Sequence, residues 1–158
     1  MSEVTQVNYE FKKLGEYLKL KGGYAFKSSD FIDQGIPIIR ISNIKNNIVD
    51  LSKSIFCKES ETLEEFSVSN GDILLAMSGA TTGKIGRYKL PFKSYLNQRV
   101  GCFKLLDSNS TDINFIYHLV SSDEFAEKIL IDAIGGAQPN ISSSQVEGMF
   151  FKFPPLTE

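Results

Sequence analysis

The segment DILLAMSGATTGKIG, residues 72–86, joins an apolar run to a glycine-rich turn that ends in Gly-Lys. Such glycines let backbone N–H groups wrap the phosphates of a nucleotide, and the lysine can bind them as well. This segment departs from a P-loop, because Gly79 and Gly83 enclose one residue too few and Ile85 replaces the Mg²⁺-binding hydroxyl. The residues after Lys84 also alternate as in a strand, whereas a P-loop leads into a helix. A glycine-rich connection between two strands is therefore favoured.

Side chains for other kinds of catalysis are scarce in this sequence. His118 is the single histidine, in a helical context, which argues against a zinc site or a histidine base. Cys57 and Cys102 stand in strand-like contexts without metal-ligand spacing. We therefore expect no catalytic and no metal-binding residue, and we expect both cysteines to be reduced thiols in a cytoplasmic protein.

The charge is unevenly distributed along the chain, although the net charge is only −2. Residues 73–106 contain six basic residues and no acidic one, whereas residues 107–158 contain eight acidic residues and two lysines. This pattern suggests that the middle of the chain attracts a polyanion, but lysines on the solvated face of a strand would give the same pattern.

The composition fits one domain of 158 residues, with no internal repeat and no apolar run long enough for a membrane span. The polar opening, MSEVTQVNYEFKK, does not have the pattern of a secretory signal. We therefore expect a cytoplasmic protein that does not contact a membrane.

Periodicity predicts an α+β fold rich in strands, with a twisted, mainly antiparallel sheet or partial barrel and few helices. Strands are expected in YEFKKLG, IPIIRIS, ILLAMSG, KIGRYKL, QRVGCFKLL and MFFKFPPL, and short helical turns in EYLKL and ESETLEEF. The longest helical region is expected at about 112–134, with a possible capping box formed by Ser121 and Glu124 at its second segment.

Five stretches in order identify a resemblance to a known family. They are GYAFKSSDF, GIPIIRISNIKNNIV, NGDILLAMSGATTGKIGRY, LNQRVGCFKL and GGAQPNISSSQVEGMFFKFPPLTE. Together they cover most of the chain from Gly22 onward, and the sequence resembles a single target recognition domain of the specificity subunit of type I restriction-modification enzymes.

This resemblance implies that the chain reads one half of a split site in double-stranded DNA and is not itself an enzyme. It implies as partners the methyltransferase (M) and restriction (R) subunits. These subunits would carry S-adenosylmethionine, ATP and Mg²⁺, so no cofactor is expected in this chain. Family members follow each such domain with a long helix that acts as a spacer. We expect one recognition domain over residues 1–158, with that helix absent, as in a fragment or a truncated gene product.

Polar and basic side chains in the predicted loops and in the central basic stretch are the candidates for DNA contacts. Arginine suits guanine, asparagine and glutamine suit adenine, and lysine, serine and threonine suit phosphates. The candidates are Lys27, Ser28, Asn43, Lys45, Thr81, Thr82, Lys84, Arg87, Lys93, Tyr95, Arg99, Gln138 and Asn140. Arg40, Asn97 and Gln98 belong to the family's shared pattern and are expected to support the fold, and the same argument applies to Gln138 and Asn140.

Two alternatives to DNA recognition remain open at this point. One is an enzyme that binds a nucleotide at the 79–84 glycine turn. The other is a protein-interaction module whose helical face, Ile113 to Leu130, docks a methyltransferase.

Overall fold

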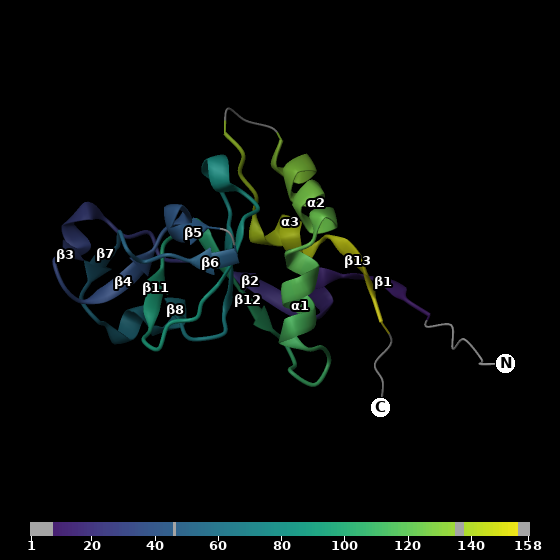
Figure 1. Cartoon of the computed structure of the whole chain (residues 1–158), viewed down its shortest axis with the longest axis horizontal. Helices are drawn as coiled ribbons and strands as arrows, with labels where there is room; N and C mark the ends of the chain where they lie inside the picture. Colours follow the sequence, from purple (N-terminus) through teal and green to yellow (C-terminus); the bar gives the residue numbers. More distant parts are fainter. Residues whose placement is uncertain (1–7, 46, 135–137, 155–158) are drawn as a thin grey trace.

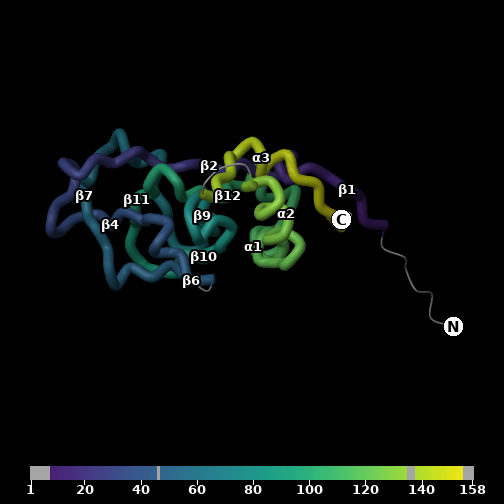
Figure 2. The backbone as a smooth tube through the Cα atoms, turned by 90° about the horizontal axis from the view of Figure 1, so that it is seen from above, coloured from purple at the N-terminus to yellow at the C-terminus, as the bar shows by residue number. Residues whose placement is uncertain are grey.

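The computed structural model describes residues 8–45, 47–134 and 138–154. In this part of the chain the strands form three sheets, and the α-helices gather at one end, as Figure 1 shows. Seen from above in Figure 2, the five-stranded sheet lies at the end opposite to the α-helices. No helix of the described part has the length and apolar character needed to cross a membrane.

The central sheet has six strands in the order β2-β12-β9-β10-β6-β5. Their bounds are β2 Leu18–Lys21, β12 Val100–Leu105, β9 Ile73–Ala76, β10 Ile85–Arg87, β6 Asn47–Val49 and β5 Ile44–Lys45. β10 pairs parallel to β6, and the other neighbouring strands in this sheet are antiparallel. All four residues of β9 are buried, which explains why its sequence is continuously apolar and not alternating.

The second sheet has five short strands in the order β3-β7-β4-β11-β8. Their bounds are β3 Phe31–Ile32, β7 Ile55–Cys57, β4 Ile36–Ile39, β11 Ser94–Leu96 and β8 Ser67–Val68. Three 3₁₀ helices lead directly into strands of the two sheets: η2 Ser28–Asp30, η3 Ile41–Asn43 and η4 Glu61–Phe66.

The helical end contains α1 Ile113–Val120, α2 Asp123–Ala133 and α3 Ser143–Glu147, beside a two-stranded ribbon of β1 Glu10–Lys13 and β13 Phe150–Phe153. Figure 1 shows α1 and α2 beside this ribbon. Both helices bury their apolar stripe in the same core as the central sheet, through Ile116, Val120, Phe125 and Ile129. The face that the sequence offered for docking a methyltransferase is thus largely used inside this chain.

The predicted α+β fold is confirmed, as is the helical region, but some local predictions are wrong. EYLKL was expected to be a helical turn, yet the 3₁₀ helix η1 is Leu14–Glu16 and Leu18–Lys21 is strand β2. The side chain that caps α2 is Ser122, which accepts a hydrogen bond from Phe125 N, and not Ser121. Both cysteines are free and buried, and burial raises the pKa of Cys102 to about 12.

Candidate nucleic-acid interface

Residues 72–86 fold as a strand, a turn and a second strand, as predicted. β9 and β10 pair antiparallel, with Ile85 opposite Leu75, and the 3₁₀ helix η5 Gly79–Thr81 makes most of the turn. Gly79 and Gly83 have φ angles of 78° and 93°, in the region that favours glycine. The glycines therefore serve the turn, and the strand after Lys84 excludes a P-loop at this position.

The η5 turn is fastened to a segment that is distant in sequence. Gly79 N donates to Pro139 O at 3.0 Å, and the Thr82 hydroxyl donates to the carbonyl oxygens of Gly79 and Pro139 at 2.7 and 3.3 Å. A short β-bridge joins Ser78 to Asn140. Thr82 is buried and its hydroxyl is engaged, so the structure places this predicted DNA contact inside the turn.

Arg99, the residue immediately before β12, joins the η5 turn to the segment around Asn140. Its Nη2 donates to the carbonyl oxygens of Met77 and Ile141 at 3.2 and 3.1 Å, and to Asn140 Oδ1. Ile141 N in turn donates to Met77 O at 2.9 Å. The guanidinium is therefore directed toward the protein backbone, and not toward solvent as the sequence suggested.

A third loop, formed by η3 and the residues after it, lies against the η5 turn. A side chain added at Gly79 would come within 3.2 Å of Ile41 Cδ1. Asn43 holds this loop closed, because its Oδ1 accepts from Arg40 N at 2.8 Å and its Nδ2 donates to Asp50 O at 3.0 Å. Asn43 is only 3% exposed, so this candidate is placed as a buried scaffold residue.

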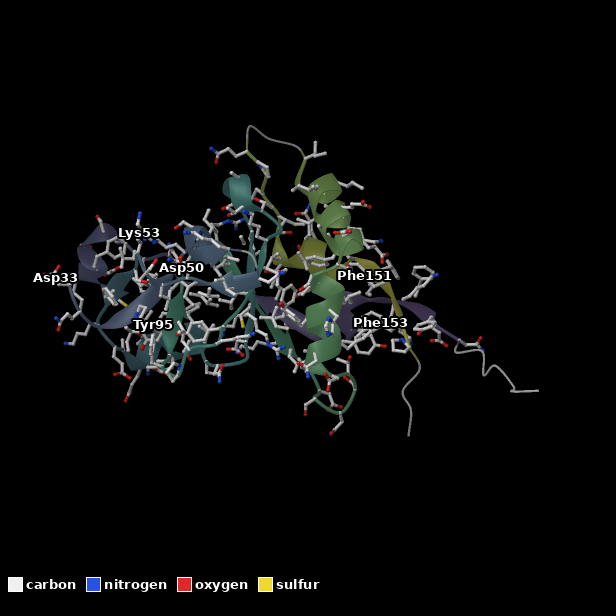
Figure 3. The ribbon with its side chains drawn as sticks, viewed as in Figure 1. Asp33, Asp50, Lys53, Tyr95, Phe151 and Phe153 are labelled. Carbon is white, nitrogen blue, oxygen red and sulfur yellow. The ribbon has the colours of Figure 1, made fainter. Side chains whose placement is uncertain are left out.

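We use the name loop surface for the exposed or half-buried polar residues that these three segments present. They are Lys45, Asn47, Lys53, Lys84 and Gln138. Thr81, another predicted contact, is half-buried in η5, and its hydroxyl oxygen is buried. In Figure 3 Lys53 is labelled above β4, between the positions that Figure 1 gives to β3 and β5.

Cationic side chains of the loop surface have few internal partners. Lys45 makes a long ion pair with Asp50 at 3.7 Å, with the Lys45 side chain exposed and that of Asp50 partly exposed. Within residues 8–45, 47–134 and 138–154, the structure records no ion pair for Lys53 or Lys84. A groove of about 180 Å³ runs between Asn47 and Lys84 on one side and Ser121 on the other. This surface can thus offer lysine and amide donors to an anion.

Two of the predicted contacts lie at the far sheet, away from the loop surface. Lys27 and Ser28 are exposed at η2, which precedes β3. Arg87 is on the central sheet, where its Nη2 donates to Asn114 Oδ1 at 2.9 Å and its guanidinium lies 5.1 Å from the Tyr117 ring centroid. The sequence named all three as DNA contacts, but the structure places Lys27 and Ser28 beside β3 and directs the Arg87 guanidinium toward α1.

Lys93 and Tyr95 belong to an acidic cluster. Lys93 Nζ forms ion pairs with Glu59 and Glu64, and the Tyr95 hydroxyl donates to Glu64 Oε1 at 3.0 Å. The hydrogen bonds that Lys93 donates to both carboxylates raise the pKa of Lys93, and the hydrogen bond from Lys93 lowers the pKa of Glu64. Tyr95 is fully buried. We call these four residues the Lys93 cluster, in which two carboxylates more than neutralise the charge of Lys93.

Sequence reasoning missed Asn47 and Lys53. Asn47 has a φ of 66°, a left-handed conformation that asparagine tolerates better than most residues, so the NIKNN turn carried a usable signal. Lys53 follows β6 in a polar loop, and nothing in its local sequence distinguishes it from other surface lysines.

Solved structures with the same fold are specificity subunits of type I restriction-modification systems. The S subunit from M. genitalium aligns over 98% of this chain and 36% of its own, with a TM-score of 0.66 and 16% identity. The HsdS subunit from Thermoanaerobacter tengcongensis aligns over 98% and 35%, with a TM-score of 0.65 and 16% identity. The fold is therefore that of a domain of a specificity subunit.

Sequence comparisons identify the family. The family described as "Type I restriction modification DNA specificity domain" matches residues 6–158, and the chain belongs to it. The MjaVIII specificity subunit of Methanocaldococcus jannaschii is 28% identical over 99% of this chain. The EcoKI specificity subunit of Escherichia coli is 29% identical over 80% of it. This chain spans 39% and 27% of the lengths of these two relatives. The predicted class, a DNA recognition domain and not an enzyme, is confirmed.

Proposed function

We propose that this chain reads one half of a split target in double-stranded DNA for a type I restriction-modification enzyme, and that the loop surface makes the contact. The observation that carries the proposal is the convergence of three sequence-distant loops that direct lysine and amide side chains outward. Family membership supports DNA as the ligand. We further propose that methyltransferase and restriction subunits are the partners, and that S-adenosylmethionine, ATP and Mg²⁺ are bound by those subunits.

The side chains of the loop surface divide into two proposed roles. Lys45, Lys53 and Lys84 fix the register by contacting phosphates, because a flexible ammonium group binds a phosphate without reading sequence. Asn47 and Gln138 carry amide groups, which can donate to and accept from base edges in the major groove. Among the earlier candidates, Asn43, Thr82 and Arg99 are proposed to support these loops, since their polar groups are engaged internally.

The salt dependence of DNA binding tests this proposal. Affinity of the chain for a duplex should fall as salt rises, because each neutralised phosphate releases counterions. Lys84→Ala should reduce the slope of log affinity against log salt by about one, the value for one lost phosphate contact. Fluorescence anisotropy with a labelled duplex over a salt series gives both quantities.

Lys89→Ala is the matched control, because Lys89 is also exposed and lies just beyond the other end of β10. About 16 Å of extended chain separate the two positions at the usual rise of a strand. A DNA affinity that does not change with salt concentration would contradict any contact with DNA phosphates. An equal change of slope in both variants would place the contact elsewhere than on the loop surface.

A further inference from the structure

Arg99 sits where two loops of the loop surface meet the central sheet. It lies immediately before β12, and Met77 N donates to Arg99 O at 3.0 Å, so its backbone is part of the sheet's hydrogen bonding. Its side chain is half-buried and reaches across to Asn140 and Ile141. The backbone of Arg99 is thus fixed in the central sheet, and its guanidinium binds a segment that is distant in sequence.

The two segments that Arg99 joins carry proposed DNA contacts. Met77 leads directly into the η5 turn, which presents Lys84, and Gln138 lies two residues before Asn140. Gly79 N and Ile141 N donate backbone hydrogen bonds of ordinary length, 3.0 and 2.9 Å, between these segments. Arg99 and the Thr82 hydroxyl add side-chain bonds across the same seam.

We propose that Arg99 is a positioning residue for sequence recognition, which fixes Gln138 relative to Lys84 without itself contacting DNA. The inference rests on the proposed function of the loop surface. A planar guanidinium can satisfy several fixed acceptors at once, whereas a lysine ammonium at the same position would be held less firmly. Loops that are held in place before binding lose less conformational entropy on binding, and this gain is largest for the duplex that fits them.

The test starts from the duplex that the wild-type 158-residue chain enriches from a randomised pool at low salt. Affinities for this duplex and for a duplex of unselected sequence are then measured for the wild type and for Arg99→Lys. Arg99→Lys should lower the affinity for the selected duplex by about tenfold, as expected when several side chains must be immobilised on binding. Its affinity for the unselected duplex and its salt slope should not change.

Substitutions of Asn140 provide a second measurement that does not alter Arg99. Asn140→Asp offers a carboxylate to the guanidinium, so the connection and the ratio of the two affinities should be retained even if both affinities fall. Asn140→Leu removes the acceptor and should lower the ratio as Arg99→Lys does. Circular dichroism confirms that each variant is folded at the temperature of the measurement.

Other results would overturn the positioning role. A salt slope reduced by about one in Arg99→Lys, with both duplexes weakened alike, would make Arg99 a phosphate contact. A less stable variant with an unchanged affinity ratio would restrict Arg99 to supporting the fold. If the wild type and Arg99→Lys prefer the selected duplex over the unselected one by the same factor, only this inference fails. If the wild type enriches no duplex, the proposed function fails together with it.

Discussion

Lys84 and Lys93 lie nine residues apart in a stretch without acidic residues, yet their surroundings in the fold differ completely. Lys84 is exposed on the loop surface, and no ion pair is recorded for it within the described ranges. Lys93 forms ion pairs with Glu59 and Glu64. These two glutamates come from an acidic part of the chain, within and just before η4, which packs beside the five-stranded sheet. A run of like charges in sequence is therefore a poor guide to the charge that a folded surface presents.

The difference suggests two uses for lysine in one small domain. In the Lys93 cluster the cation joins carboxylates and a buried tyrosine, a local role in the five-stranded sheet. On the loop surface the cations have little internal compensation, so their field is available to a polyanion. Changing the two regions in matched ways separates these roles.

The largest expected effect is the loss of DNA affinity in the double variant Lys45→Glu, Lys84→Glu. Reversing two charges at proposed phosphate contacts should weaken binding about a hundredfold at low salt, at about 1.4 kcal/mol for each position. The double variant Lys89→Glu, Lys93→Glu changes the net charge equally and should reduce affinity far less. Duplex titrations of both variants measure the contrast, and equal losses would remove the distinction between the two regions.

Gly83→Ala should change stability and DNA binding together, because Gly83 sets the backbone that presents Lys84. Its φ of 93° is unfavourable for alanine, and the new Cβ would lie 3.1 Å from Ile129 Cγ2. We expect a loss of about 2 kcal/mol in the free energy of unfolding, together with weaker DNA binding.

Gly71→Ala is the control for this substitution. Gly71 has a similar φ of 99°, but nothing lies within 4 Å of an added Cβ. Only the backbone cost of about 1 kcal/mol should appear, with DNA affinity unchanged. Urea denaturation measures both variants, and a larger loss for Gly71→Ala would contradict the role given to the Ile129 contact.

Asn43→Ala should lower stability by about 1.5 kcal/mol, because buried polar groups of the loop after η3 would lose their partner. The Arg40 N–H and the carbonyl of Asp50 are the groups affected. DNA binding should weaken only indirectly, through a looser loop. If Asn43→Ala keeps full stability but abolishes binding, Asn43 is a direct contact as its sequence first suggested.

The sequence predicted those parts of the fold that depend on interactions between residues close together in the chain. The apolar run of β9, the glycine turn and the helices from Ile113 to Ala133 depend on neighbouring residues, and all were predicted. The short strands β3, β7 and β8 were missed, since strands of two or three residues carry little periodicity and depend on their partners in the sheet.

The candidate site was harder to predict, because exposure and pairing are decided between distant segments. Thr82, Asn43 and Arg99 have side chains typical of DNA contacts, but each is engaged with a carbonyl that the sequence did not place nearby. Lys53 became a candidate only through its position in the fold. Residue types thus predicted a polar and basic surface, whereas the tertiary structure was needed to show which residues form it.

The smallest expected effect is that of Lys93→Met, which should leave DNA affinity unchanged and reduce stability less than Gly83→Ala, because the ion pairs are partly exposed. The reduction should depend on pH. The pKa of Glu64 is lowered in the folded state from its ordinary value of 4.5, so its interaction with Lys93 contributes fully above that value. This contribution is lost as pH falls through the folded-state pKa, and the stability difference between wild type and variant should shrink there. Thermal unfolding between pH 7 and pH 3 measures it, and a difference that stays constant over this range would show that the Lys93 cluster stabilises the fold by packing and not by charge.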